Sequence, residues 1–332
     1  MGNLKSAFVC LLCLLGSVGC VRQSGDADGE AAKLSIAVIP KCTSSEFWEI
    51  VEEGARAAAE KHQVDMRWEG TLTEMQVAEQ NQIIENMVSL DVDGIALAAL
   101  NDKAMRKQVE SATAAGIPVV LFDSIVEGDA HMSFVATDNV LGGEMAGKHI
   151  AELIGRPEAE LVVFRYLQGA ASGEARCRGF IQAVTAAGMK VVADPHPEDG
   201  SVAGCKKTAG NTLEGFIREG KLKLDGIFCC NDRSSMGAVA ALDDIRKSGV
   251  EVDVKCIGFD FPPKLVAALQ AGKVDAIIAQ DPYRMGFLVV ETLIKHLKGE
   301  QVPDFIDTGV KLVTNSRLQE DAALRKLVGL DE

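Results

Sequence analysis

The sequence predicts an α/β protein of two lobes, each a doubly wound parallel sheet. Short apolar runs alternate with segments of helical periodicity from residue 34 to residue 313. This is the pattern of parallel strands joined by right-handed crossover helices. About ten such runs are too many for one comfortable sheet. At 332 residues the chain is also long for a single core, so two lobes are expected.

The chain contains a near-repeat that supports the division into two lobes. Residues 34–122 and residues 161–259 each pass through several strand–helix units. Each stretch ends in an apolar strand followed by an aspartate, Asp123 in the first and Asp260 in the second. The repeat length is that of a whole lobe, so it does not indicate a solenoid.

The first strand–loop–helix unit predicts a binding loop. Residues 34–39 form an apolar run typical of a strand buried on both faces, and apolar residues then recur at helical spacing over 46–62. Ser44 or Ser45 can cap that helix. The loop between lies at the carboxyl end of a strand, where open parallel sheets bind ligands. Lys41 and Ser45 supply polar groups there, and Phe47 and Trp48 supply flat apolar walls.

The remaining strands and helices are predicted from the same signals, short apolar runs for strands and apolar residues at helical spacing for helices. We expect further strands near residues 64–68, 94–98, 118–122, 132–136, 160–165, 189–193, 225–230, 254–259, 275–279 and 308–313. Helices are expected near residues 74–90, 102–115, 139–154, 174–187, 202–219, 233–248, 263–271 and 283–298.

Polar residues collect where the predicted strands end. These positions are Asp123, Asp138 within 137–139, Asn231 with Asp232, Asp260, and Gln280 with Asp281. Taken singly, each is more often a helix cap than a ligand group. Because the carboxyl ends of parallel strands share one edge of a sheet, together they predict one cleft between the lobes.

Composition excludes one class of partner. The net charge is −14 and hydrophobic residues make up 47% of the chain. Nucleic acid binding needs patches of lysine and arginine, so no nucleic acid partner is expected.

The N-terminus predicts export. Lys5 precedes an apolar stretch over residues 7–15, then small residues and Cys20, as in a signal peptide. The stretch is too short to span a membrane. Small residues before a cysteine resemble a bacterial lipobox, which implies a signal peptide over 1–20, lipidation at Cys20 and a flexible tether over 21–33. Ser17 departs from the usual lipobox, so cleavage by an ordinary signal peptidase stays an alternative.

The cysteines outside this segment are expected to be structural. They are Cys42, Cys177, Cys205, Cys229, Cys230 and Cys256. Their spacing matches no zinc pattern, so neither a metal nor another cofactor is expected. Most of them stand in apolar runs, which favours buried free thiols, with disulfides as the alternative in an oxidising compartment.

These residues together resemble the periplasmic sugar-binding proteins of ABC transporters. The resemblance is to the type I solute-binding fold and, within it, to the ribose- and allose-binding group. It extends over about residues 34–313 and rests on Lys41 and the segments 45–48, 122–123, 137–143, 176–180, 231–232, 257–260 and 279–280. It implies two Rossmann-like lobes joined by a three-segment hinge, with crossings near residues 137, 280 and 309.

The resemblance also implies which residues contact a sugar. Phe47 and Trp48 correspond to aromatics that sandwich the ring, and Lys41 to a ligand-contacting lysine. Ser45 corresponds to a residue that is usually asparagine. The polar ring corresponds to Asp123, Arg176, Asn231, Asp260 and Gln280, and we add Ser124 and Asp138 as neighbouring candidates. Flat side chains suit the C–H faces of a sugar, and planar polar groups suit its hydroxyls.

Two departures from the ribose-binding pattern argue against ribose itself. Ser124 follows Asp123 where ribose binders carry an arginine, and residues 195–199 lack the aromatic that closes the sandwich. We expect a larger or differently substituted sugar, with Lys41 replacing the lost donor.

The predicted function is an exported binding protein, not an enzyme. It captures a pentose or hexose and delivers it to an ABC transporter permease. The N-terminal lobe would take 34–137 and 281–309, and the C-terminal lobe 138–280 and 310–332. We expect a monomer in the periplasm or cell envelope that touches the membrane only through its lipid anchor.

Three alternatives are weighed against this function. A sensory protein would present the same closed form to a histidine kinase or chemoreceptor. A glycosidase would use Asp123 and Asp260 as paired carboxylates. The chain also resembles the effector domain of lactose-repressor-type regulators, but a signal segment occupies the place of their helix-turn-helix.

Overall fold

The computed structural model describes residues 33–331. The predicted signal peptide, the Cys20 lipidation site and nearly all of the predicted tether lie outside the described residues. None of the helices within 33–331 combines the length and apolarity that a membrane span requires.

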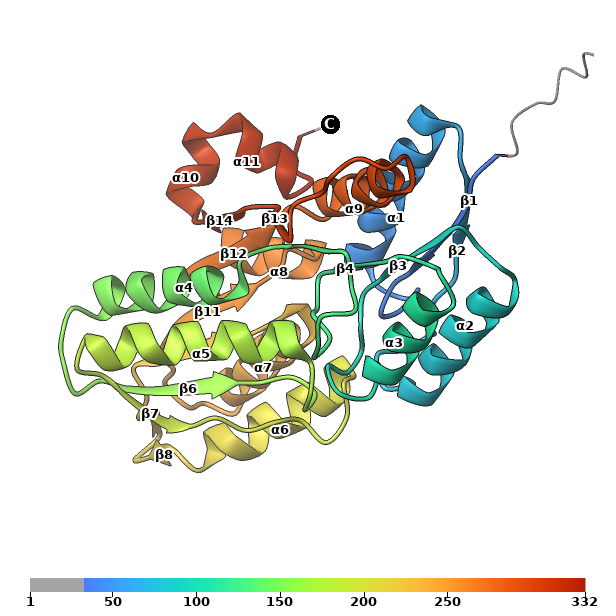
Figure 1. Ribbon diagram of the computed structural model, residues 1–332. Coiled ribbons are helices and arrows are strands. Elements are labelled where there is room, and N and C mark those ends of the chain that lie inside the picture. The colour runs from blue at the N-terminus through green and yellow to red at the C-terminus, as the bar shows by residue number, and fades with distance from the viewer. Residues whose placement is uncertain (1–32, 332) are drawn as a thin grey trace, which may run out of the picture. The chain divides into compact units, whose positions relative to one another are not determined.

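The first sheet, sheet A, is entirely parallel, with strand order β13-β5-β4-β3-β1-β2. Its strands are β1 (Ser35–Ile39), β2 (Asp65–Trp68), β3 (Gly94–Leu97), β4 (Val119–Phe122), β5 (Ser133–Ala136) and β13 (Phe305–Asp307). Helices α1 (Glu46–His62) and α9 (Pro282–Leu297) cover one face, and α2 (Val77–Ser89) and α3 (Arg106–Ala114) the other (Figure 1).

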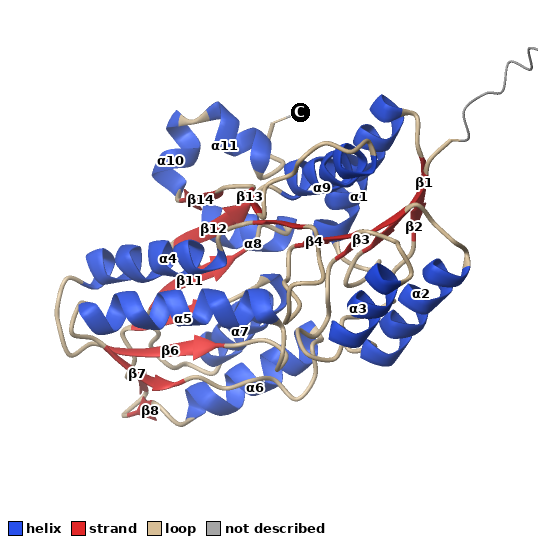
Figure 2. Cartoon of the chain, in the orientation of Figure 1, coloured by secondary structure: helices blue, strands red, loops and turns tan. Residues whose placement is uncertain are grey.

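The second sheet, sheet B, repeats this plan with strand order β14-β12-β11-β10-β6-β7. Its strands are β6 (Glu160–Phe164), β7 (Lys190–Ala193), β10 (Gly226–Cys229), β11 (Lys255–Phe259), β12 (Ala276–Gln280) and β14 (Val310–Val313), the last antiparallel to β12. Helices α4 (Asn139–Ile154) and α5 (Ala171–Ala186) cover one face (Figure 2). The other face carries α6 (Val202–Glu214), α7 (Asp232–Lys247) and α8 (Pro263–Gln270). The predicted fold of two doubly wound lobes is confirmed.

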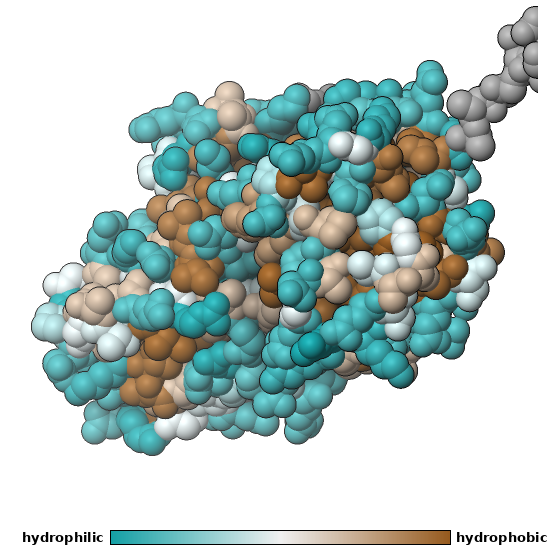
Figure 3. All heavy atoms as spheres, viewed as in Figure 1, coloured by the Kyte–Doolittle hydropathy of each residue, from teal (hydrophilic) through white to brown (hydrophobic). Residues whose placement is uncertain are grey.

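Both faces of each sheet are buried, which explains the continuous apolar runs in the sequence. On β1, Ile36 and Val38 pack under α1 and α9, whereas Ala37 and Ile39 pack under α2 and α3. All four are at most 1% exposed. The outer surface is different, because hydrophilic side chains cover most of the face in Figure 3, with hydrophobic patches between them.

The chain passes between the sheets three times. It leaves sheet A after β5, leaves sheet B after β12, and crosses again in the two residues between β13 and β14. The first and third crossings touch, since the hydroxyl oxygens of Thr137 and Thr308 are 3.2 Å apart. Gly309 has φ 84°, a left-handed conformation that glycine adopts without strain.

Several element boundaries differ from the prediction. Helix α2 begins at Val77 rather than near 74, because Thr71 Oγ donates to the carbonyl of Lys41 (2.7 Å) and holds the preceding loop. Helix α3 begins at Arg106 rather than near 102, because Asn101 Oδ1 accepts from the amides of the next residues and forms a turn.

Other elements were not predicted. Residues 217–219, expected in a helix, belong to a hairpin of β8 (Ile217–Arg218) and β9 (Lys221–Leu222). Glu219 and Gly220 between them both have positive φ, as a type I′ turn requires. The strand expected over 308–313 is β14 alone, and β13 precedes it. Helices α10 (Asn315–Glu320) and α11 (Ala322–Leu327) pack on the same hydrophobic core of sheet B as α7 and α8.

Candidate functional site

A pocket of about 430 Å³, including the solvent at its mouth, lies where the carboxyl ends of strands from both sheets meet. Its lining comes from both lobes: Lys41, Ser45, Phe47, Trp48, Glu74, Asp123, Tyr166, Ala170, Ser172, Gly173, Arg176, Asn231, Asp232, Asp260 and Gln280. The polar residues that follow the predicted strands in the sequence therefore lie at the sheet edges that form this pocket.

The candidate residues from the sequence line the pocket except Ser124, Asp138 and Asp281, the last of which caps α9 by accepting from the amide of Arg284 (3.0 Å). Ser124 lies behind the lining, 1% exposed, and its Oγ donates to Ser172 Oγ (3.0 Å). Asp138 borders a second, neighbouring cavity instead. Its carboxylate caps α4 by accepting from the amide of Leu141 (2.9 Å), which is the capping role that its place before a helix favours.

The N-terminal lobe contributes a buried ion pair. Lys41 and Asp123 are each 4% exposed, and Lys41 Nζ lies 2.6 Å from Asp123 Oδ2. The same Nζ donates to Ser172 Oγ of the other lobe (3.1 Å). Ser172 thus accepts from both Lys41 and Ser124, and these hydrogen bonds connect the two lobes beside the pocket.

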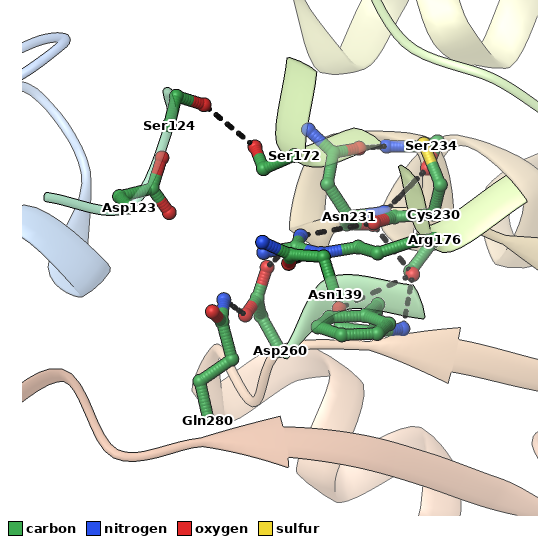
Figure 4. Close-up of polar contacts among 12 residues, drawn as sticks. Asp123, Ser124, Asn139, Ser172, Arg176, Cys230, Asn231, Ser234, Asp260 and Gln280 are labelled. Carbon is green, nitrogen blue, oxygen red and sulfur yellow. Dashed lines mark hydrogen bonds and ion pairs between the residues drawn. The ribbon is translucent and has the colours of Figure 1, made fainter. Parts of the chain in front are cut away.

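The C-terminal lobe contributes an arginine held on several sides (Figure 4). Arg176, 3% exposed, donates from Nε to Asn139 Oδ1 (2.8 Å) and from Nη1 to the carbonyl of Cys230 (3.0 Å). Its guanidinium lies 3.9 Å from the centre of the Phe259 ring, and Nη1 is 3.7 Å from Asp260 Oδ2. A planar guanidinium with this many contacts has little freedom to reorient.

Close helix packing fixes the backbone of Arg176. Helices α4 and α5 approach so closely that a Cβ on Gly143 would clash with the carbonyl oxygen of Arg176. A Cβ on Gly179 would clash with the carbonyl of Val140 in the same way. The glycines therefore set the depth at which Arg176 enters the pocket.

Asp260, Gln280 and Asn231 complete the polar wall of this lobe. Gln280 Nε2 donates to Asp260 Oδ1 (2.7 Å). Asn231 is the N-cap of α7, where its Oδ1 accepts from the amide of Ser234 (2.9 Å) in a capping box. Asn231 is therefore a cap and a lining residue at once, and its amide Nδ2 remains a donor for the pocket.

Aromatic side chains reach the pocket from both lobes. Trp48 is 3% exposed and packs edge-on against Phe47, with ring centroids 5.0 Å apart, and against Phe122. Tyr166, two residues past β6, lines the pocket from the other lobe and donates to the carbonyl of Gly200 (3.1 Å). Residues 195–199 supply no aromatic to the lining, so the second-lobe ring comes from a different loop, which sequence reasoning missed.

Two more carboxylates line the pocket, and sequence reasoning missed one of them, Glu74. Glu74 lies in the loop before α2, where its Oε1 accepts from Trp48 Nε1 (3.3 Å). Asp232 begins α7, and burial, with the charges of Asp260 and Glu74, raises the pKa of Asp232 to about 7. Burial also raises the pKa of Asp260, against the opposing effect of Arg176. The pair Asn231–Asp232 was visible in the sequence, but nothing there marked Glu74.

The six described cysteines are free and buried, in agreement with the thiols expected from their apolar surroundings. Burial raises the pKa of Cys42 to about 11 and that of Cys205 to about 12. Within residues 33–331, no cluster of three or more histidine, cysteine or acidic side chains is arranged to hold a metal ion.

Known proteins share both the sequence pattern and the fold of this chain. Residues 36–301 match the model of the family described as periplasmic binding protein domain. The chain belongs to this family. It is 30% identical over 300 residues to the ribose import binding protein of Escherichia coli K12, which covers 89% of this chain and 96% of that protein. It is 27% identical to the D-ribose/D-allose-binding protein of Pseudomonas aeruginosa over 85% of this chain and 89% of that protein.

Solved structures agree with the family. A carbohydrate transporter solute binding protein from Agrobacterium radiobacter in complex with D-arabinose superposes with a TM-score of 0.82 and 32% identity, over 90% of this chain and 99% of that one. An ABC transporter solute binding protein from Agrobacterium vitis with bound D-fucose has a TM-score of 0.80 and 33% identity, over 87% and 98%. These proteins are binding proteins rather than enzymes, which does not favour the glycosidase alternative.

Proposed function

We propose that this protein captures a monosaccharide in the pocket between its lobes and delivers it to the membrane permease of an ABC transporter. The observation that carries the proposal is the pocket itself. Aromatic side chains and planar polar groups line the same pocket. The C–H faces of a sugar pack on the aromatic side chains, and its hydroxyl groups pair with the planar polar groups. The names of the relatives, which are import and transporter binding proteins, favour transport over the sensory alternative.

The proposed roles follow from position. Phe47 and Trp48 hold one face of the sugar and Tyr166 approaches from the other lobe. The hydrogen-bonding ring is Lys41, Ser45, Asp123, Arg176, Asn231, Asp260 and Gln280. A polar group left unpaired beside a buried sugar costs about 1–3 kcal/mol, so this ring discriminates between epimers.

The proposed mechanism is closure of two lobes around the sugar. The N-terminal lobe comprises residues 34–137 and 281–309, and the C-terminal lobe 138–280 and 310–332. Only the closed form lets both lobes contact the ligand, so the ligand stabilises that form. We further propose that the protein acts in the periplasm as a monomer held to the membrane through lipid on Cys20.

Thermal unfolding with a panel of pentoses, hexoses and their deoxy and amino relatives tests the proposal. Residues 33–332 form a compact unit by themselves and serve as the sample. A sugar at about 100 times its dissociation constant adds about 2.7 kcal/mol, a rise of several degrees in Tm. One sugar that raises Tm while its epimers do not supports the proposal. A folded, ligand-free sample that responds to no sugar contradicts it.

A further inference from the structure

Acidic side chains outnumber basic ones in the lining of the pocket. The carboxylates are Glu74, Asp123, Asp232 and Asp260, and the cations are Lys41 and Arg176. Lys41 lies 2.6 Å from Asp123, and Arg176 lies 3.7 Å from Asp260. Each cation is thus matched to one aspartate, which leaves Glu74 and Asp232.

Neither remaining carboxylate has a cation in contact. Within residues 33–331, no lysine, arginine or histidine nitrogen lies within 4.0 Å of Glu74 or Asp232. The charge of Arg233 acts on both carboxylates without contact, since its Nη2 donates to the sulfur of Cys42 (3.7 Å) and Arg233 does not line the pocket. The combined effect of burial, Asp260 and Glu74 on the pKa of Asp232 exceeds that of Arg233.

One neutral polar group of the lining also lacks a donor within residues 33–331. Gln280 is 2% exposed, and its Nε2 is bonded to Asp260, whereas its Oε1 has no hydrogen-bond partner among the described residues. A ligand that offers a donor to this buried amide oxygen is favoured over one that does not. The pocket therefore offers more acceptors than donors, and a protonated amine supplies three donors and no acceptor.

We propose that the ligand is an amino sugar, a monosaccharide in which one hydroxyl is replaced by a protonated amine that pairs with Glu74 and Asp232. The inference rests on the proposed function and names its substrate class. Trp48 Nε1 donates to Glu74 Oε1 (3.3 Å), so this carboxylate lies at the pocket beside an aromatic side chain of the lining. A neutral sugar in the same place would bury the two carboxylates without a counterion, which is unfavourable.

Calorimetric titration of residues 33–332 tests this with matched sets of sugars. Each set contains an amine, its hydroxyl parent and its N-acetyl derivative: D-glucosamine, D-galactosamine, D-mannosamine and 6-amino-6-deoxy-D-glucose are the amines. We expect one amine to bind about 10- to 100-fold more tightly than its hydroxyl parent, and its N-acetyl derivative to bind weakly or not at all.

Variants assign the preference to the two carboxylates. Glu74→Gln and Asp232→Asn should each reduce the ratio of amine to hydroxyl affinity about tenfold. Glu85→Gln removes the same charge from an exposed position of α2 and should leave the ratio unchanged. Unfolding midpoints of all three variants show that the fold is retained, and Glu74→Gln, outside any helix or strand, gives a readout even if Asp232→Asn does not fold.

The outcomes separate this inference from the proposed function. If a hydroxyl sugar binds as tightly as every amine of the panel, the charge inference is overturned and monosaccharide binding stands. If neither amines nor hydroxyl sugars bind to a folded sample, both are overturned. Retention of the full preference in Glu74→Gln and Asp232→Asn would also overturn the inference.

Discussion

Each lobe places an aspartate at the pocket, and the two aspartates have nearly the same backbone conformation. Asp123 follows β4 with φ 57°, and Asp260 follows β11 with φ 65°. Each amide donates to the carbonyl of a residue on the next strand, Asp123 to Val135 (3.1 Å) and Asp260 to Ile278 (2.8 Å). A left-handed conformation is unusual outside glycine, although asparagine and aspartate adopt it more readily than most residues.

The partners of these aspartates differ. Asp123 pairs with the single ammonium of Lys41, which also reaches across to Ser172 of the other lobe. Asp260 lies beside Arg176, whose guanidinium is fixed by partners within its own lobe, and also accepts from Gln280. The same backbone conformation therefore carries two different aspartates. Asp260 is preorganised by partners within its own lobe, whereas the counterion of Asp123 also bonds to the other lobe.

The largest effect should come from Arg176→Met. This change leaves Asp260 buried without its cation and frees the acceptors of Asn139 and Cys230, so we expect a loss of about 3–5 kcal/mol in the free energy of unfolding. Urea unfolding measures it. Arg178→Met, on the exposed face of the same helix, is the matched control. Equal stability of the two variants would show that the network is not preorganised as described.

Lys41→Met should have a smaller effect. The lysine makes one buried ion pair and one hydrogen bond to a hydroxyl, fewer contacts than Arg176 makes, so we expect a loss of about 3 kcal/mol, at the lower end of the range for a broken buried ion pair. The exposed Lys107 of α3 provides the control Lys107→Met. A loss as large as that of Arg176→Met, measured in the same urea titration, would mean that the two acids depend equally on their counterions.

The smallest effect should be the dependence of stability on pH. Because the pKa of Asp232 is raised from 3.8 to about 7, the folded state holds a proton that the unfolded chain has lost over this range. Stability should therefore fall as pH rises from about 4 to about 7, by on the order of 1 kcal/mol, since Asp232 is only half-buried.

The pH effect depends on the groups that face Asp232. Asp260 and Glu74 raise its pKa and Arg233 lowers it. Asp232→Asn should flatten the curve of unfolding free energy against pH between 4 and 7. A variant curve as steep as that of the original chain would assign the dependence to other groups, Asp260 first among them.

The parts of the molecule predicted from sequence are those governed by short-range patterns. Buried strands appear as apolar runs, and the aspartates after them mark the sheet edge, so Asp123, Asp260 and Gln280 could be placed at one pocket. Glu74, Tyr166 and Ser172 could not. They lie in or beside loops whose course depends on distant groups, such as the bond from Thr71 to the carbonyl of Lys41.

The same limit explains Ser124 and Asp138. Both follow strands as the other candidates do, but the side chain of Ser124 bonds to Ser172 behind the lining and that of Asp138 caps α4. Position after a strand predicts the neighbourhood of a side chain. The direction in which that side chain points is decided by its hydrogen-bond partners, whose positions the sequence does not reveal.

The last strands of the two sheets determine when each lobe can complete its fold during synthesis or export. Residues 305–307 complete sheet A and residues 310–313 complete sheet B. A ribosome or an export channel that releases the chain from its N-terminus delivers both of these edge strands near the end. Both sheets are therefore completed only near the end of the chain, and a chain that stops short of residue 305 leaves two unfinished sheets rather than one intact lobe.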